Sequence, residues 1–143
     1  MKIQEIARSA HAGQFRRDGV TPYINHPQEV ASHFWEGTFQ NEIAWLHDVL
    51  EDSAITPELL KEFGVHTLVI KAVEYLTHEK GQPYFEYISS LMTATRQSSN
   101  DAIAARMALQ VKLIDIAVNL GDSPTPRQVK KYAGALKIIH AFP

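Results

Sequence analysis

The densest group of acid–base side chains in the sequence is the run HDVLED at residues 47–52. On a helix, residues four apart share a face, so His47 lies above Glu51 and Asp48 lies above Asp52. Three carboxylates in the last turn of a helix meet the negative end of its dipole, which disfavours each of them. The run therefore indicates either a solvated acidic helix end or a site that holds a cation.

A single carboxylate interrupts the apolar segment VKLIDIAV at residues 111–118. Because hydrophobic residues flank Asp115 on both sides, we expect its side chain to be largely removed from water. A buried carboxylate needs a cation or a set of hydrogen-bond donors. Lys112 and Asn119, at i−3 and i+4, could supply a local partner, and a metal ion is the alternative.

The third candidate is His26, which precedes Pro27 at the expected start of a helix. Such a histidine is more often a cap or loop residue than a ligand. Taken together, however, His26, His47, Asp48 and Asp115 form a set of two nitrogen and two oxygen ligands, which suits Mn, Fe, Co, Ni or Zn better than Ca or Mg. A metal with open positions can acidify a bound water and polarise a phosphoryl oxygen, as phosphoester hydrolysis requires.

Further residues could assist that chemistry. Glu51 and Asp52, one turn beyond the proposed ligands, could orient the water and exchange protons with the leaving group. Arg16 and Arg17 lie in a loop that contains glycine and proline, and arginine can pair with phosphate or stack on a base. Loop arginines are also often plain surface residues, and we interpret Tyr23 in the same loop as a packing residue.

The elements that must position these residues are helices, because apolar residues recur at three- and four-residue steps along most of the chain. The pattern predicts a first helix that starts at residue 3 and is ended by Gly13, and further helices at 27–36, 40–52, 57–63, 66–77, 84–95, 101–120 and 126–141. Residues 15–27 contain Gly19, Pro22 and Pro27 and indicate a structured loop. We therefore expect one all-α domain of about seven or eight helices over residues 1–143.

Composition limits the function classes. The 143 residues carry 14 Lys and Arg against 16 Asp and Glu, a net charge of −2, so we expect no nucleic-acid polymer as a partner. The absence of cysteine excludes disulfides and thiol chemistry. No segment has the pattern of a signal peptide or a membrane span, so we expect a cytoplasmic protein without a membrane partner. A homo-oligomer stays open, because Trp35, Phe39 and Trp45 could be core or contact residues.

Three blocks of sequence carry a resemblance to a known family: AHAGQFRRDGVTPYINHPQEVA at 10–31, AWLHDVLEDSAITPELLKEFG at 44–64 and VKLIDIAVNLGD at 111–122. In this order they resemble the HD-domain phosphohydrolases, and within them the hydrolase domain of RelA/SpoT-type enzymes and the small alarmone hydrolases. The resemblance implies an all-α HD domain that removes pyrophosphate from the 3′ position of guanosine tetra- or pentaphosphate, through attack by a metal-bound water. Some members act on other nucleotides, including NADPH.

The resemblance also assigns roles to residues. It implies a divalent metal, usually Mn²⁺, held by His26, His47, Asp48 and Asp115. It implies that Glu51 and Asp52 form the catalytic acid pair. The positions that match nucleotide contacts are Arg16, Arg17 and Asn119.

The chain departs from the family pattern next to the nucleotide positions. Gly121 and Ile116 stand where family members commonly have basic residues, although the ligand set is intact. A phosphomonoesterase acting on nucleotides or NADPH is therefore the alternative function. A non-catalytic nucleotide-binding module is a weaker alternative, since none of the acid–base residues is lost. Since the chain ends at Pro143, we expect no synthetase or regulatory domain to follow.

Overall fold

The structure, a computed structural model, describes residues 1–142, which fold as helices joined by loops. The helices within this range are α1 (Ile3–Ala10), α2 (Asn25–Ala31), α3 (Phe39–Leu46), α4 (Val49–Asp52), α5 (Pro57–Glu62), α6 (Thr67–Tyr75), α7 (Tyr84–Ala94), α8 (Asn100–Leu120) and α9 (Pro126–Ala141). An isolated antiparallel bridge joins Phe15 to Pro22 in the loop before α2. The predicted all-α class is confirmed.

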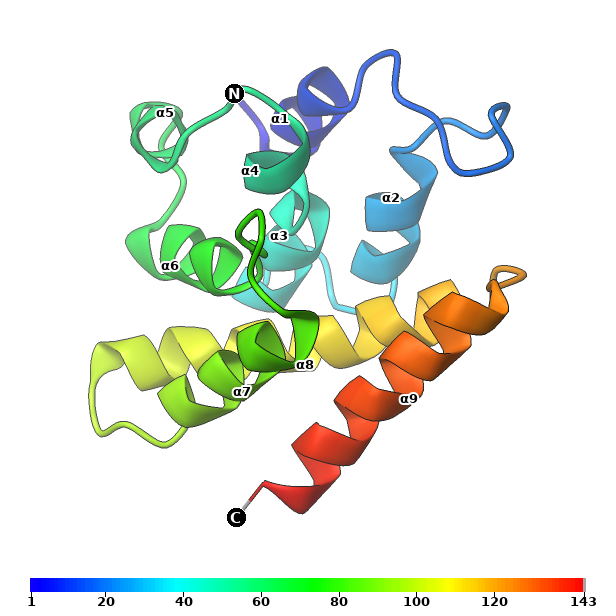
Figure 1. The fold of residues 1–143 in the computed structure, drawn as a ribbon. Coiled ribbons are helices and arrows are strands. Elements are labelled where there is room, and N and C mark those ends of the chain that lie inside the picture. Colours follow the sequence, from blue (N-terminus) through cyan, green and yellow to red (C-terminus); the bar gives the residue numbers. More distant parts are fainter. Residues whose placement is uncertain (143) are drawn as a thin grey trace.

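The 21-residue helix α8 is the centre of the arrangement (Figure 1). Helices α2, α3 and α6 pack against one side of it, and α7 and α9 pack against the other. The long loop between α1 and α2 lies near the end of α8 and the start of α9. Helix α8 therefore touches most of the elements that carry candidate site residues.

Two groups of buried side chains hold α8 in place. The larger group joins α1, α2, α3, α6 and α8, and its fully buried members include Ile43, Val69 and Val111. The smaller group lies between α7, α8 and α9 and includes Ile116 and Tyr132. Burial of one large aliphatic side chain stabilises the fold by about 1.5–3 kcal/mol, so packing on both sides fixes the direction in which α8 presents its polar residues.

The segment predicted as a helix at 27–36 forms a shorter helix that starts earlier, at Asn25, and ends at Ala31. The Nδ2 group of Asn41, on α3, donates hydrogen bonds to the carbonyls of Ala31 at 3.0 Å and Phe34 at 3.3 Å. These contacts satisfy carbonyl groups that would otherwise need a further helical turn. The pattern of α2 alone could not show this partner, because it comes from the next helix.

The helix predicted at 40–52 is divided into α3 and α4 at His47 and Asp48. Asp48 has φ −104° and ψ 0°, outside the helical range, so the chain changes direction between the two residues. On an unbroken helix, consecutive side chains would point about 100° apart. The division accounts for the ninth helix within residues 1–142, one more than the pattern predicted.

The aromatic residues left open by the sequence are now placed. Trp45 is 6% exposed and belongs to the core, and Phe39 packs against it. Trp35 is 87% exposed. No helix within residues 1–142 combines the length and apolar character that crossing a bilayer requires.

Candidate functional site

Three buried side chains from three separate helices meet beside the α3–α4 break. His26 comes from the first turn of α2, His47 from the end of α3 and Asp115 from the middle of α8. His26 Nε2 lies 2.7 Å and His47 Nε2 lies 3.4 Å from Asp115 Oδ1. One ligand atom from each residue lies within 4.8 Å of the other two, so a single ion could contact all three.

The ring of His47 is oriented by its own helix. Its Nδ1 donates a hydrogen bond to the Ala44 carbonyl at 2.6 Å, and a carbonyl can only accept. In the neutral ring, Nε2 therefore carries the lone pair, which is the arrangement that metal-binding histidines use. His47 Nε2 is buried and has no hydrogen-bond partner of acceptable geometry within residues 1–142. An orphaned nitrogen facing carboxylate oxygens fits a cation at this point.

Asp48 borders this group of three. Its Oδ2 lies 3.1 Å from His47 Nε2 and 4.0 Å from His26 Nε2. The same oxygen accepts a hydrogen bond from the hydroxyl of Tyr23 at 2.6 Å. Burial, together with the negative charge of Asp48, raises the pKa of Tyr23, so this phenol stays protonated and remains a donor. Tyr23 thus orients a candidate ligand, which differs from the packing role expected from the sequence.

The charges at the centre also indicate a cation. Burial opposes the ionised form of Asp115, yet Lys112 and the two histidines hold the pKa of Asp115 well below its usual range. Burial would likewise lower the pKa of His47, but the carboxylates of Asp48 and Asp115 raise it well above its usual value. Two ionised carboxylates in this enclosed space thus favour an added positive charge, from a proton or from a metal ion.

Lys112 and Asn119 hold Asp115 from both sides along α8. Lys112 Nζ lies 3.2 Å from Asp115 Oδ2, and Asn119 Nδ2 donates to Asp115 Oδ1 at 3.0 Å. These are the local partners that the sequence offered as an alternative to a metal. Both local partners contact Asp115 in the structure, and its Oδ1 also faces both histidines.

The two acids of α4 are placed differently. Glu51 lines the cavity in front of the three central residues, and its Oε1 accepts a hydrogen bond from the backbone N–H of His78 at 2.7 Å. Asp52 lies on the exposed side of α4, where its backbone carbonyl accepts a hydrogen bond from Gln14 at 2.7 Å. Partial burial and the nearby carboxylates of Asp48 and Glu51 raise the pKa of Asp52 to about 6.

The predicted substrate residues lie at one end of the same cavity, which has a volume of about 290 Å³. Arg16 donates to Asn119 Oδ1 at 3.2 Å and pairs with Asp122 Oδ2 at 2.9 Å. Arg17 donates to the backbone carbonyls of Asp122 and Ser123, at the turn between α8 and α9. Arg16, Arg17 and Asn119 all line the cavity, and the Asn119–Asp115 hydrogen bond connects them to the centre.

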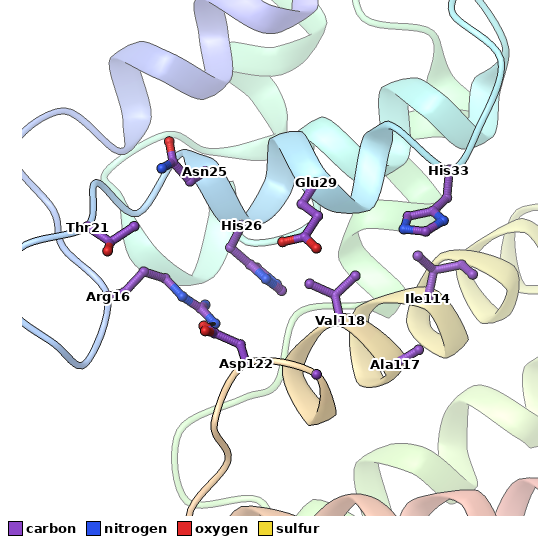
Figure 2. Close-up of a pocket in the computed structure, with 11 residues that line it drawn as sticks. Arg16, Thr21, Asn25, His26, Glu29, His33, Ile114, Ala117, Val118 and Asp122 are labelled. Carbon is purple, nitrogen blue, oxygen red and sulfur yellow. Dashed lines mark hydrogen bonds and ion pairs between the residues drawn. The ribbon is translucent and has the colours of Figure 1, made fainter.

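A second and larger cavity, of about 500 Å³, lies between α2 and α8 (Figure 2). Glu29 of α2 and His33, in the turn after α2, face Ile114 and Val118 of α8 across it, and His26 reaches its wall. The acidic residues Asp48, Glu51 and Asp115 line the smaller cavity instead. The smaller cavity therefore holds the candidate chemistry, and Arg16 and His26 line both cavities.

The fold and the site together define a class: an all-helical protein with a buried histidine–carboxylate centre of the kind that holds a divalent metal. No protein-family model matches the chain. A segment of 63 residues, 41% of this chain, is 52% identical to the guanosine-3′,5′-bis(diphosphate) 3′-pyrophosphohydrolase of Haemophilus influenzae and spans 9% of that protein. Over 129 residues, 85% of this chain and 67% of the relative, it is 34% identical to the guanosine-3′,5′-bis(diphosphate) 3′-pyrophosphohydrolase MESH1 of Danio rerio. The chain belongs to this family of pyrophosphohydrolases.

Proposed function

We propose that the protein is a metal-dependent 3′-pyrophosphohydrolase that acts on guanosine 3′,5′-bis(diphosphate), with Mn²⁺ as its metal. The observation that carries the proposal is the convergence of His26 Nε2, His47 Nε2 and Asp115 Oδ1 within 4.8 Å, at the wall of a cavity that also presents arginines. The names of the two relatives support the choice of substrate.

In this proposal the metal is held by His26, His47 and Asp115, with Asp48 as the fourth ligand. The two neutral histidines and two carboxylates match a borderline transition metal. When bound, such a metal polarises a phosphoryl oxygen and lowers the pKa of a water molecule. Tyr23 and Lys112 hold the two carboxylates in position through their contacts at 2.6 and 3.2 Å.

The reaction adds water to the phosphorus attached to the 3′ oxygen. The bond between that phosphorus and the 3′ oxygen breaks, the 3′ oxygen takes a proton, and guanosine diphosphate and pyrophosphate leave. Glu51, which lines the cavity, is positioned to accept a proton from the attacking water. Asp52, whose raised pKa of about 6 favours its acid form more than usual, is the second acid of this proposal, although it lies on the exposed side of α4 and is not among the residues that line the cavity.

Arg16, Arg17 and Asn119 form the nucleoside end of the cavity in this proposal. A guanidinium can pair with a phosphate or stack on a base, and Arg16 is held in place by Asn119 and Asp122. The arginines therefore bind the substrate without contacting the reacting phosphorus.

The test is a substrate assay of the Mn²⁺-loaded protein with guanosine 3′,5′-bis(diphosphate), with separate detection of pyrophosphate and orthophosphate. Release of pyrophosphate by the wild type, and its loss in His47→Ala, is the expected result. His140→Ala, at an exposed histidine in the last turn of α9, is the matched control and should retain activity. Orthophosphate as the sole product, or turnover only of NADPH, would support the phosphomonoesterase alternative and contradict the proposal.

A further inference from the structure

The end of the cavity opposite the arginines is built from aromatic and cationic side chains of α7 and α9. Lys131 Nζ lies 4.3 Å from the ring centroid of Tyr84 and 5.3 Å from that of Tyr132. Lys112 Nζ, from α8, lies 5.8 Å from the Tyr84 ring on the same cavity wall. Two ammonium groups and two phenols thus share this end, and none of them belongs to the proposed metal ligands.

The positive charge of Lys131 has no carboxylate partner in the described part of the chain. The ion pairs formed among residues 1–142 include Lys112 with Asp115 but none with Lys131. Partial burial, together with the neighbouring charge of Lys112, lowers the pKa of Lys131. The surroundings of the Lys131 ammonium therefore disfavour its positive charge. A bound anion would favour that charge instead.

A hydroxyl group at the same place also lacks an acceptor for its own hydrogen. Tyr84 Oη is buried and has no hydrogen-bond partner of acceptable geometry within residues 1–142. Burial raises the pKa of Tyr84 despite the opposing effect of Lys112, so the phenol stays protonated and can donate. Buried donors are nearly always satisfied in folded proteins, so an unsatisfied one that lines a cavity indicates a missing acceptor.

We propose that Lys131 and the Tyr84 hydroxyl form an anion subsite for the second phosphoryl group of the substrate's 3′-diphosphate. This inference rests on the proposed function, since it places the first phosphoryl group at the histidine–carboxylate centre. An oxyanion with several acceptor oxygens can receive hydrogen bonds from an ammonium and a phenol at once. Both groups bind substrate and neither contacts the reacting phosphorus.

The order of residues along α8 sets the direction of the substrate. Asn119 lies four residues after Asp115 and contacts Arg16, whereas Lys112 lies three residues before Asp115 and faces Tyr84. At 1.5 Å per residue, these positions lie about 6 Å and about 4.5 Å from Asp115 in opposite directions along the helix. A nucleoside bound near Arg16 would therefore extend its diphosphate past the centre toward Lys131.

The subsite would discriminate a diphosphate from a single phosphate. A substrate with one phosphoryl group at the 3′ position would leave Lys131 and Tyr84 without their acceptor. We therefore expect Lys131→Gln to reduce the preference for 3′-diphosphate over 3′-monophosphate nucleotides, with little change in turnover of the monophosphate.

Direct binding of inorganic pyrophosphate and orthophosphate to the metal-depleted full chain, by calorimetry, tests the subsite without turnover. We expect Lys131→Gln to weaken pyrophosphate binding at least tenfold, because it removes a full positive charge, and Tyr84→Phe to weaken it about three- to tenfold, because it removes one hydrogen bond. Lys130→Gln is the matched control, because Lys130 is the exposed neighbour on α9 and lies outside the cavity lining, and it should bind as the wild type does. Undetectable binding to the wild type, or equal binding to Lys131→Gln, would overturn the subsite.

The substrate assay on the Mn²⁺-loaded variants separates the two proposals. One possible result is that the wild type hydrolyses no nucleotide but binds pyrophosphate, and that the Lys131→Gln variant binds pyrophosphate more weakly. In that case the proposed function fails and the anion subsite stands. If the wild type releases pyrophosphate from guanosine 3′,5′-bis(diphosphate) and Lys131→Gln shows the same KM and the same pyrophosphate affinity, the function stands and the subsite fails.

Discussion

The Tyr23 hydroxyl donates a 2.6 Å hydrogen bond to Asp48 Oδ2, across 25 residues of sequence. This bond connects the loop that carries the arginines to the point where α3 ends. Because the same oxygen faces His47 Nε2 at 3.1 Å, the phenol fixes which lone pairs of Asp48 remain for a metal. Tyr23 therefore acts on the proposed centre through Asp48.

Tyr23→Phe is expected to weaken Mn²⁺ binding by about 10- to 100-fold while leaving the fold intact, because outer hydrogen bonds orient metal ligands. Calorimetric titration of Mn²⁺ into the metal-depleted protein would measure the change. Tyr75→Phe, on α6 and away from the cavity lining, serves as the control. Equal affinity for Mn²⁺ in Tyr23→Phe and the wild type would argue against this role.

Removal of Asp115 should cost both metal binding and stability. Asp115→Ala leaves Lys112 as a buried charge without its partner, and such changes lower the free energy of unfolding by about 3–5 kcal/mol. Adding Lys112→Met to Asp115→Ala should recover part of that loss but no metal binding. Denaturant unfolding of the two variants, with metal analysis of each, separates the effects. Full Mn²⁺ occupancy in Asp115→Ala would contradict the ligand assignment.

Glu51→Gln should retain the metal and lower turnover by about 10²- to 10⁴-fold, the usual contribution of a general acid or base. Glutamine keeps an oxygen that can accept the His78 N–H hydrogen bond, so the local structure should persist. Parallel measurements of kcat and Mn²⁺ affinity provide the check. Glu79→Gln, at the exposed acid beside His78, is the control. A variant that loses its metal would show that Glu51 has a structural role instead.

Asp52→Asn is expected to stabilise the metal-free protein at pH 8 but not at pH 4. The folded state raises the pKa of Asp52 from 3.8 to about 6, so it holds a proton that the unfolded chain releases. That proton stabilises the folded state fully below pH 3.8, and the benefit is lost as the pH rises through 6. Solvent screening of this exposed side chain keeps the effect small.

Thermal unfolding of the wild type and Asp52→Asn from pH 4 to pH 8, in the presence of a chelator, tests this expectation. The difference in Tm should grow up to about pH 6 and then level off. Glu62→Gln, an exposed acid at the end of α5, should show no such rise. A difference in Tm that is constant across the range would rule out the raised pKa as its source.

Arg16→Ala should raise KM for the nucleotide about tenfold or more and lower kcat less, because its contacts bind the substrate without touching the reacting group. Steady-state kinetics on the Mn²⁺-loaded variant measure both constants. Arg8→Ala, whose guanidinium lies over the Trp45 ring on the α1 side, is the control. A loss confined to kcat would instead place Arg16 at the transition state.

The sequence alone predicted the all-α class and the segments that meet at the centre. Asp115 could be chosen because a carboxylate in an apolar helix must find a partner, whatever the details of packing. His47 stands out through the acids that follow it, and His26 only in combination with the other candidate ligands. The end of α2 and the division between α3 and α4 could not be predicted. At both places a side chain from another element makes contact: Asn41 bonds to the end of α2, and Tyr23 bonds to Asp48 at the division between α3 and α4.

The far end of the cavity was also beyond prediction from pattern. Tyr84 and Lys131 are separated by 47 positions, and neither helix shows a feature that sets them apart from ordinary surface-facing residues. Lys131 Nζ lies 4.3 Å from the Tyr84 ring centroid because α7 packs against α9. The local sequence of either helix does not predict this packing. The meeting of the buried histidines and Asp115 could be predicted because a buried charge needs partners, whereas the residues of the surrounding pocket depend on how distant helices pack.

Lys112, Asp115 and Asn119 all lie on the single continuous helix α8. Their shared helix limits how the pocket could be altered. Their spacing along the axis, about 10 Å from first to last, is fixed by helical rise and cannot be stretched residue by residue. A variant adapted to a longer or shorter ligand would have to change α7, α9 or the arginine loop. We therefore expect differences in nucleotide selectivity to arise from changes in α7, α9 or the arginine loop, while the spacing of the three α8 residues stays the same.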